Sequence, residues 1–505
     1  MYIKNYLCWN IIKILWQNMK TNTKYVICAI LVSFFIVSSA TGIEVKQSYL
    51  SDFDPLTDIE VTVEIQKIRA FDKDDPQVHV KEYIDQLSDP DFYVKIIIND
   101  QEFTSDTWHD TKYIYEPQFL ATLDVPDDEE FVTVKIQLWD SNDNGDVLCD
   151  IGDENNDAEL SYSIKTGHWT GDDQLEDPSG YGRLNGCDDG SIYRRDLDCE
   201  LWFDIYQSDY DGDGVPYWTE VNDYGTDPEV DNTNDDIDGD DIPLKWEWKW
   251  EYNPLEADDH RNIDPEEDGI DNYEEYITSE WFSDPYRIDL FIELDQMEQS
   301  PEGEECLLPE GSKELLYTAY DRQNVVYHLD DGSWEEQSGS DFIPFDSLTE
   351  CSWGGHDELD QIYDEYFIQD ESDSWRRGVF HYGVVIYQSS IVNGNMFGPN
   401  RFQISAHGME WKQGQFPFLH LQRDIIYASA YMHECGHTLD FRPIPGHNKA
   451  SYYPWQIGWW LAHPYKSCMN YGYMYTTVDY SDGSRPFGDY DDWERMDLTF
   501  FQEDW

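Results

Sequence analysis

The stretch Tyr431-Met-His-Glu-Cys-Gly-His-Thr-Leu439 decides the fold of the C-terminal part of the chain. His433 and His437 are four residues apart, so on a helix their imidazoles lie on one face, one turn from each other. This spacing lets both rings reach a single Zn²⁺, and it lets Glu434 reach a metal-bound water as general base. The alternative is a helix that carries these three residues by chance, so the flanking sequence must decide.

The sequence before this helix alternates between apolar strand patterns and helical patterns. Strands are predicted at 288–294, 324–329 and 379–387, helices at 312–323 and 356–367, an edge strand at 401–405 and a long helix at 419–439. Residues 288–505 are therefore predicted to form an α/β domain with a cleft along the edge strand.

The histidine helix, together with Ser467-Cys-Met-Asn-Tyr471, resembles the metzincin clan of zinc metallopeptidases. The resemblance implies a metzincin-like catalytic domain that hydrolyses peptide bonds. It also implies that Met469 forms a Met turn beneath the zinc. Zinc would lower the pKa of a bound water to about 7, and Glu434 would take its proton and pass it to the leaving amine. Tyr471 or Tyr473 would stabilise the oxyanion, unless both tyrosines only pack in the core.

The chain departs from this clan after the second histidine. Asp440 stands where the clan has glycine, and Pro443, which cannot bind metal, stands where the clan has its third ligand. His447 is the preferred third ligand, because Gly446 allows the chain to turn and imidazole is a good zinc ligand. Asp440 and then His463 are the alternatives.

Residues 206–287 repeat one acidic pattern three times, at a spacing of 27 to 28 residues. Each copy has acidic residues at loop positions 1, 3 and 5, an aliphatic residue at 7 and Glu at 12, which is the layout of an EF-hand calcium loop. The predicted Ca²⁺ ligands are Asp209, Asp211, Asp213, Val215 and Glu220 in the first loop, Asp236, Asp238, Asp240, Ile242 and Glu247 in the second, and Asp264, Glu266, Asp268, Ile270 and Glu275 in the third.

Each acidic loop is followed by a short aromatic stretch and a dipeptide such as Asp227-Pro228, so the repeats resemble thrombospondin type-three and dockerin-like calcium repeats. The second loop has Asp241 where glycine is usual, and this predicts the weakest of the three sites. A Ca²⁺-stiffened spacer is the expected role, with a protein-docking surface as a second option. A solvated acidic linker is the alternative.

Residues 44–166 carry strand patterns at 59–65, 93–98 and 131–139, and they are predicted to form an all-β sandwich. The stretches Asp91-Phe-Tyr-Val-Lys95 and Leu138-Trp-Asp140 resemble the C-two domain. That resemblance implies a Ca²⁺ site at Asp85, Asp91, Asp140 and Asn142, but Leu148 falls where a further acidic ligand is expected, between Asp146 and Asp150. The alternative is that these acids are ordinary turn residues.

Residues 167–205 are rich in Gly, Asp and Ser and are predicted to be an irregular connector. Seven cysteines follow residue 40, and in an exported chain disulfides are expected. The suggested pairs are Cys187 with Cys199, Cys306 with Cys351, and Cys435 with Cys468, which leaves Cys149 over.

The N-terminus predicts export. Lys20 and Lys24 precede an apolar run at 25–37 and small residues near Ala40, which is the pattern of a signal peptide over residues 1–40 with Met19 as an alternative start. An uncleaved membrane anchor is the alternative. The formal net charge of −74 excludes nucleic acid as a partner and argues against an anionic membrane surface.

Together these patterns predict a secreted or cell-surface, calcium-stabilised zinc endopeptidase that acts on protein or peptide substrates. The competing hypothesis is a non-enzymatic calcium-dependent adhesion protein with a degenerate metallopeptidase domain. The intact set of His433, Glu434 and His437 favours the enzyme, whereas the displaced third ligand favours the adhesion protein.

Overall fold

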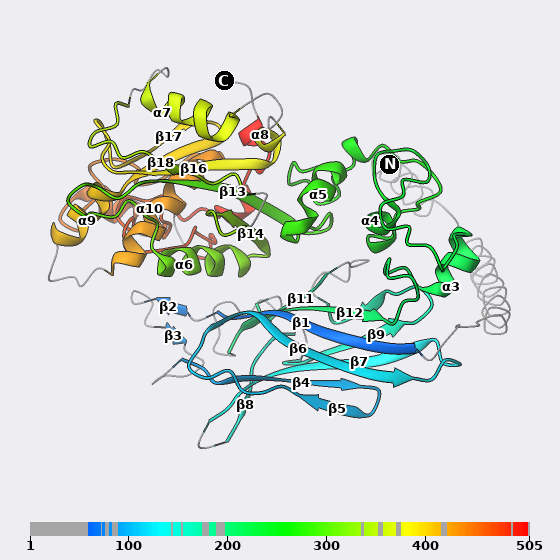
Figure 1. Cartoon of the computed structure of the whole chain (residues 1–505). Helices are drawn as coiled ribbons and strands as arrows, with labels where there is room; N and C mark the ends of the chain where they lie inside the picture. Colours follow the sequence, from blue (N-terminus) through cyan, green and yellow to red (C-terminus); the bar gives the residue numbers. More distant parts are fainter. Residues whose placement is uncertain are drawn as a thin grey trace, which may run out of the picture.

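The computed structural model describes residues 59–71, 73–75, 80–82, 89–142, 145–152, 155–173, 181–187, 197–334, 338–351, 357–369, 375–415, 422–485 and 488–502. Figure 1 shows a β-sandwich, a small loop-rich region and an α/β domain, in chain order. The predicted leader and Asp85 lie outside the described residues. Within these ranges no helix has the length and hydropathy needed to cross a bilayer.

Two antiparallel sheets form the N-terminal region. One sheet has the order β11 (Gly182–Asn185), β12 (Cys199–Gln207), β1 (Ile59–Ala70) and β6 (Tyr113–Val125). The other has the order β10 (Trp169–Gly171), β9 (Ala158–Ser163), β7 (Phe131–Asp140), β4 (Phe92–Ile98) and β5 (Gln101–Thr104), with β8 (Val147–Leu148) beside β7. A separate short pair joins β2 (Lys73–Asp75) and β3 (Val80–Glu82).

The sandwich forms because its strands bury every second side chain. Along β7, Val132, Val134, Ile136 and Leu138 are buried, whereas Phe131 and Thr133 are exposed. The prediction of an irregular connector at 167–205 is wrong, because β10, β11 and most of β12 lie there. β12 pairs with β1 along nine register positions, so it completes the sheet that the preceding residues cannot close alone.

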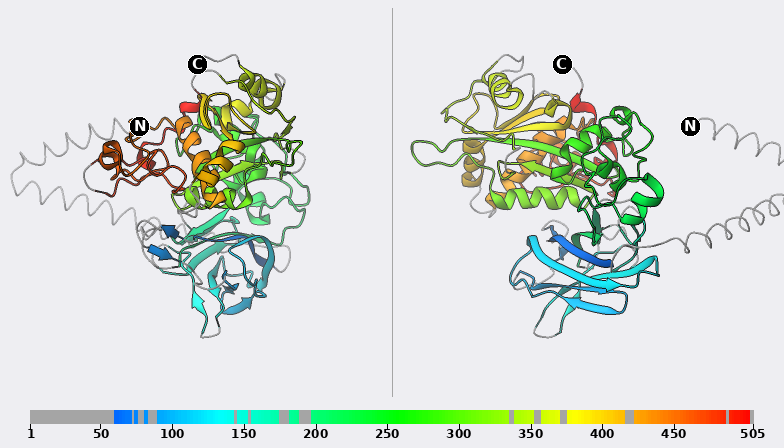
Figure 2. Two further views of the ribbon diagram at one scale, coloured as in Figure 1. Left: turned by 90° about the vertical axis from the view of Figure 1, so that its left-hand side faces the viewer. Right: turned by 45° about the vertical axis from the view of Figure 1, so that its right-hand side comes forward.

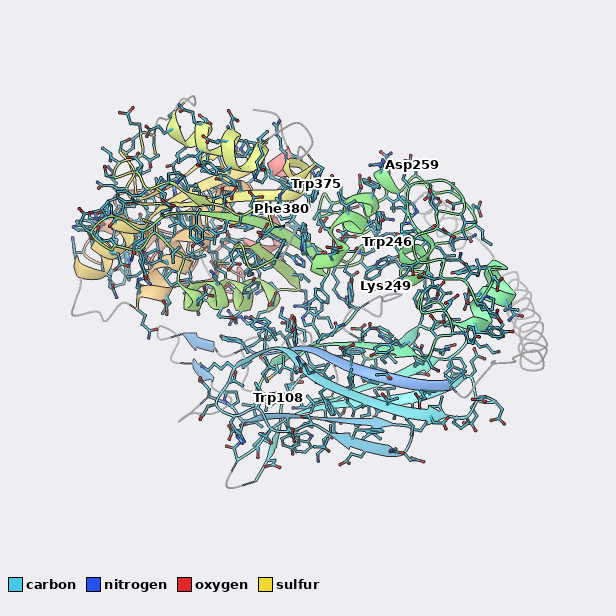
Figure 3. All side chains as sticks on the ribbon, viewed as in Figure 1. Trp108, Trp246, Lys249, Asp259, Trp375 and Phe380 are labelled. Carbon is cyan, nitrogen blue, oxygen red and sulfur yellow. The ribbon has the colours of Figure 1, made fainter. Side chains whose placement is uncertain are left out.

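The small region at 206–287 follows the sandwich directly. Its helical segments are α3 (Tyr217–Thr219), η1 (Glu220–Tyr224), α4 (Leu244–Lys249), η2 (His260–Asn262), α5 (Asn272–Thr278) and η3 (Ser279–Trp281). A small hydrophobic core of Ile242, Trp246 and Trp250 holds these turns together. Figure 3 shows Trp246, Lys249 and Asp259 in this region, which lies beside the α/β domain and above the sandwich in this view.

The C-terminal region is a mixed α/β domain. Its sheet has the order β14 (Val325–Asp330), β13 (Ile288–Met297), β16 (Phe380–Ile386), β18 (Arg401–Ser405) and β17 (Gly394–Gly398), with β15 (Phe342–Ile343) beside β13. All neighbours are parallel except β17, which runs antiparallel to β18. The helices are α6 (Glu310–Asp321), α7 (Glu358–Ile362), η4 (Tyr363–Ile368), α8 (Arg376–Val379), α9 (Ala406–Gln415), α10 (Arg423–Thr438), α11 (Ile457–Ala462), η5 (Trp493–Arg495) and η6 (Phe500–Gln502).

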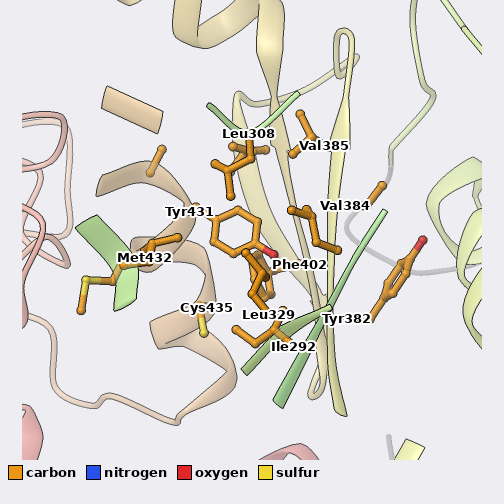
Figure 4. Packing of buried hydrophobic residues seen from close by; sticks show 14 of the residues in the cluster. Ile292, Leu308, Leu329, Tyr382, Val384, Val385, Phe402, Tyr431, Met432 and Cys435 are labelled. Atoms are coloured by element: carbon orange, nitrogen blue, oxygen red, sulfur yellow. The ribbon is translucent and has the colours of Figure 1, made fainter. Parts of the chain in front are cut away.

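Figure 1 shows α6 and α10 on one side of this sheet and α7 on the other. α10 is the central helix, and its buried residues pack on the sheet: the rings of Tyr431 and Phe402 are 4.8 Å apart, edge to face (Figure 4). The predicted strands and long helices are confirmed here. The prediction that 401–405 is the edge strand is wrong, since β17 lies outside it.

The sandwich and the α/β domain meet through a buried charge cluster. Arg69 of β1 is fully buried and places Nη1 2.7 Å from Glu314 Oε2 on α6. Its Nε lies 3.5 Å from Asp321 Oδ2 and 3.7 Å from Glu200 Oε2. Arg183 and Asn185 of β11 donate to the carbonyl of Asp321 as well. A buried guanidinium needs such partners, so this cluster fixes how the two domains lie together.

The structure forms none of the three predicted disulfides among the described cysteines. The Cys187 thiol lies 3.7 Å from Asp198 Oδ2, and the Cys435 thiol lies 3.6 Å from the Tyr320 hydroxyl. Burial raises the pKa of the Cys435 thiol to about 12, so it stays a neutral core group.

Candidate functional site

Three imidazoles converge at the C-terminal end of α10. His433, His437 and His447 each offer a nitrogen, and these nitrogens all lie within 4.8 Å of one another. Nε2 of His433 is 3.3 Å from Nε2 of His447. The ring of His437 is nearly perpendicular to the other two, with centroids 5.0 Å from each. The three nitrogens therefore face a common point and could hold one small cation.

Two segments supply the three histidines, α10 and the loop at His447, because the chain reverses direction after the helix. Asp440 adopts a left-handed φ of 52° where a glycine was expected, and Gly446 has a φ of 78°. A Cβ on Gly446 would lie 2.2 Å from Asn470 Oδ1, so only glycine fits beside this buried amide. The turn at Gly446 thus presents His447 to the helix.

The other two predicted third ligands point elsewhere. Asp440 Oδ1 lies 2.5 Å from Arg442 Nε, in an ion pair at the surface. His463 Nδ1 lies 2.7 Å from the Tyr473 hydroxyl. Tyr473 is therefore a buried residue that contacts His463, and it does not belong to the cluster of His433, His437 and His447.

The predicted Met turn lies directly beneath the helix. Nδ1 of His433 lies 2.8 Å from the Cys468 carbonyl, which accepts a hydrogen bond from Nδ1–H. This contact orients Nε2 toward the other two rings. Met469 is fully buried, and a Cβ on Gly436 would lie 2.6 Å from its sulfur. A hydrogen bond from the His433 side chain to the Cys468 carbonyl and close packing therefore join this turn to α10.

Electrostatics keep the imidazoles neutral. Burial lowers the pKa of His437 to about 3 and lowers the pKa of His433 well below its usual value. Burial also lowers the pKa of His447. Neutral imidazoles retain the lone pair that a metal ligand needs.

Glu434 lies one residue from the first histidine and against the edge strand. A Cβ on Gly394 of β17 would lie 2.5 Å from Glu434 Oε1, so the strand and the carboxyl are in contact. Burial raises the pKa of Glu434 to about 8, which suits a proton acceptor and donor near neutral pH. β17 was missed in the sequence because it is short and bounded by two glycines.

Tyr471 covers one side of the histidine cluster. Its ring centroid is 4.3 Å from that of His447 and 5.6 Å from that of His433. Tyr452 stacks on its other face at 4.8 Å. Burial raises the pKa of the Tyr471 phenol, so it remains a hydrogen-bond donor.

An exposed apolar surface lies on the segment between His447 and the Met turn. Figure 2 (left) shows this orange-red part of the chain projecting from the side of the domain. Its exposed side chains, with their exposed fractions, are Trp455 (76%), Ile457 (80%), Trp460 (63%) and Leu461 (76%). A group of large apolar side chains in water marks a contact surface. The aromatic run at 452–460 was the available sequence signal.

The three acidic loops fold alike. In each, the carboxylate at position 1 accepts the backbone N–H of position 6, at 2.8 Å for Asp209, 3.1 Å for Asp236 and 3.0 Å for Asp264. Position 6 has a left-handed φ every time, 91° at Gly214, 80° at Asp241 and 96° at Gly269. Asp241 therefore takes the strained conformation that glycine takes in its neighbours.

The carboxylates within each loop converge. Positions 1, 3 and 5 bring oxygens within 4.8 Å of one another in all three copies. The position-12 residues Glu220, Glu247 and Glu275 are buried and each has a carboxylate oxygen without a hydrogen-bond partner. Burial raises the pKa of Glu220 to about 8 and that of Glu275 well above its usual value. Val215, Ile242 and Ile270, at position 7, are buried core residues.

The acidic residues predicted for the sandwich are bound to local partners. Asp140 accepts the backbone N–H of Asp91 at 2.9 Å and the Asn142 amide at 2.7 Å. Asp146 accepts the Tyr93 hydroxyl at 2.9 Å. Leu148 lies on β8, opposite Trp139. These contacts are those of residues that end strands and shape turns.

No family model matches the chain, and no curated protein matches it. Among solved structures, a C2 domain is similar at 10% sequence identity and a TM-score of 0.18, covering 30% of this chain and 98% of that one. A C2 domain of the plant Extended Synaptotagmin 1 is similar at 12% identity and a TM-score of 0.18, covering 30% and 95%.

Human GIVD cytosolic phospholipase A2 is similar at 14% identity and a TM-score of 0.19, covering 31% of this chain. This chain spans 17% of the length of the phospholipase. The topology of the described residues gives a multidomain chain with a β-rich N-terminal region and a mixed α/β C-terminal part.

Proposed function

We propose that the chain is an exported zinc-dependent endopeptidase whose catalytic domain is stabilised by Ca²⁺-binding repeats. The observation that carries this proposal is the grouping of His433, His437 and His447 beside Glu434 and the edge strand. Export rests on the leader pattern of the sequence, and the acidic composition agrees with a soluble protein outside the cell.

The donor set fits zinc. Three neutral imidazoles with converging nitrogens are a known set for a catalytic zinc site, and the His433 ring is oriented by a carbonyl as such ligands usually are. When bound there, zinc supplies a Lewis acid that polarises a substrate carbonyl and acidifies a water.

The residues of the chain then supply binding and proton transfer. β17 is the last strand of its sheet among the described residues, so its outer N–H and C=O groups can pair with an extended peptide. Glu434 takes a proton from the attacking water and returns it to the leaving amine. Tyr471 donates a hydrogen bond from its hydroxyl to the oxygen that gains charge, while the Cys468 carbonyl holds His433 in place.

The side chains of the acidic loops match the ligand chemistry of Ca²⁺. Each buries a glutamate with unpartnered oxygens next to three converging carboxylates, and such a group is stable only when a cation replaces the missing partners. A backbone N–H of Asp289, on β13, donates to Asp268 Oδ2 at 2.8 Å. An ion in the third loop would therefore stiffen the first strand of the catalytic domain.

Casein cleavage and zinc content together test the enzyme. Glu434→Gln should lose cleavage and keep the zinc of the histidine cluster, whereas His447→Ala should lose cleavage and the zinc of that cluster. His463→Ala is the matched control and should retain zinc, because that ring lies on Tyr473 instead. Zinc bound at one equivalent with cleavage that does not depend on Glu434, or with no cleavage at all, would refute the peptidase and leave the adhesion protein.

A further inference from the structure

The second acidic loop differs from the other two in one donor. His260, the first residue of η2, places Nε2 3.2 Å from Asp240 Oδ2 and 3.9 Å from Glu247 Oε1. These three side chains form a group whose ligand atoms all lie within 4.8 Å of one another. The corresponding groups of the first and third loops contain carboxylates alone.

Asp240 accepts the backbone N–H groups of Ile242 and Asp258, whereas His260 and Glu247 are buried with side-chain atoms that lack partners. His260 is 2% exposed and Glu247 is 0% exposed. Nε2 of His260, both Glu247 carboxylate oxygens and both oxygens of Asp238 have no hydrogen bond of acceptable geometry. Burying so many unpartnered polar atoms costs several kcal/mol in total, at about 1–3 kcal/mol each, unless a ligand joins them.

The imidazole is also held in one orientation. Its ring packs edge-on against Tyr252 at 5.1 Å and Trp246 at 5.8 Å. Nδ1 lies 3.1 Å from the side-chain amide of Asn272, which is fully buried. A half-turn of this amide exchanges its oxygen and nitrogen, so Asn272 can accept an Nδ1–H and leave the Nε2 lone pair facing the carboxylates.

The donor chemistry separates two classes of cation. Ca²⁺ takes oxygen ligands and has little affinity for imidazole. Divalent ions of the first transition row accept imidazole together with carboxylate. A loop that adds a rigid, buried imidazole to its carboxylates is therefore matched to the second class.

We propose that the second acidic loop binds a divalent transition-metal ion through His260, Asp240 and Glu247, while the first and third loops bind Ca²⁺. The inference rests on the metal-binding role proposed for the acidic loops, and it is independent of the histidine cluster on α10. It gives the loop that carries Asp241 a different ion rather than a weaker calcium site.

The test compares the full chain with two variants. Each protein is stripped with EDTA and dialysed against a large excess of Ca²⁺ with Zn²⁺ at slightly more than two equivalents per chain, and its metals are counted by mass spectrometry. The parent should retain two zinc equivalents, one at each imidazole site. His260→Gln should retain one. His168→Gln should retain two, since His168 belongs to the sandwich and its Nε2 lies 2.9 Å from the Trp248 carbonyl, away from the acidic loop.

A second measurement locates the ion directly. Anomalous diffraction at the zinc edge from the parent should give a peak within bonding distance of His260 Nε2, and this result does not depend on whether a variant folds. Ca²⁺ in all three loops of the parent would overturn the inference and leave the calcium repeats intact. A second zinc that survives His260→Gln would also overturn it. No ion in any loop would refute both this inference and the proposed repeats.

Discussion

Gly446→Ala tests whether the turn before His447 builds the histidine cluster. The new methyl group needs a left-handed φ of 78°, which costs an L-residue roughly 1–2 kcal/mol. The same methyl group would lie 2.2 Å from Asn470 Oδ1 and 2.7 Å from the Ala462 side chain. Asn470 is buried and cannot move freely, because its amide donates to the carbonyls of Ala462 and Tyr465 and accepts from Gly472.

The size of the effect follows from these contacts. Losing one or two of the Asn470 hydrogen bonds adds about 1–3 kcal/mol to the strain, for a total of about 2–5 kcal/mol of lost stability. Because His447 follows the altered residue, its ring must shift. Mutations of residues that orient a metal ligand reduce metal affinity roughly 10- to 100-fold, and the loss of zinc affinity here should be larger.

The matched control is Gly303→Ala. Gly303 has a φ of 90° and open space around the position of a Cβ, so this variant carries the backbone strain without the collision. Denaturant unfolding of the metal-free proteins measures the loss of stability, and competition with a chromophoric chelator measures zinc affinity. Zinc binding by Gly446→Ala as tight as that of Gly303→Ala would refute the reasoning.

Three further predictions concern the edge strand, the acidic loops and the domain interface. Gly394→Ala should abolish casein cleavage and leave zinc bound, because the new Cβ would lie 2.5 Å from Glu434 Oε1 and displace that carboxyl. If the variant also loses zinc, the methyl group disturbs more than Glu434 and the prediction fails. Burial raises the pKa of Glu220 from 4.5 to about 8, so the metal-free folded protein binds more protons than the unfolded chain, and its stability should fall as pH rises through this window. Ca²⁺ replaces those protons, so the gap in melting temperature between calcium-loaded and EDTA-treated protein should widen with pH, and a constant gap would count against the loops. Arg69→Ala should cost about 3–5 kcal/mol in urea unfolding, because it removes the ion pair with Glu314 and takes the arginine away from the buried Asp321 carboxylate. Lys135→Ala, which removes an exposed ion pair, should cost about 1 kcal/mol or less, and equal losses would argue against the interface.

The sequence predicted the elements whose signals are local. The alternation along 131–139 gave β7, and the apolar patterns at 288–294 and 379–387 gave two central strands of the α/β sheet. It failed at β12, where composition around 167–205 indicated a connector although the strand pairs with β1 more than a hundred residues earlier. It also failed for the disulfides, because spacing along the chain says little about which thiols face each other.

By itself, the sequence determined the spacing of His433, Glu434 and His437 and the three acidic loops, since both depend on residues within one or two turns of backbone. Only the tertiary structure shows that His447, rather than Asp440 or His463, lies beside His433 and His437, because its position depends on where Gly446 directs the chain. Only the structure put β17 against Glu434, and only the structure added His260 to a loop that ends thirteen residues earlier. Contacts of this kind follow from packing between segments, which no short pattern records.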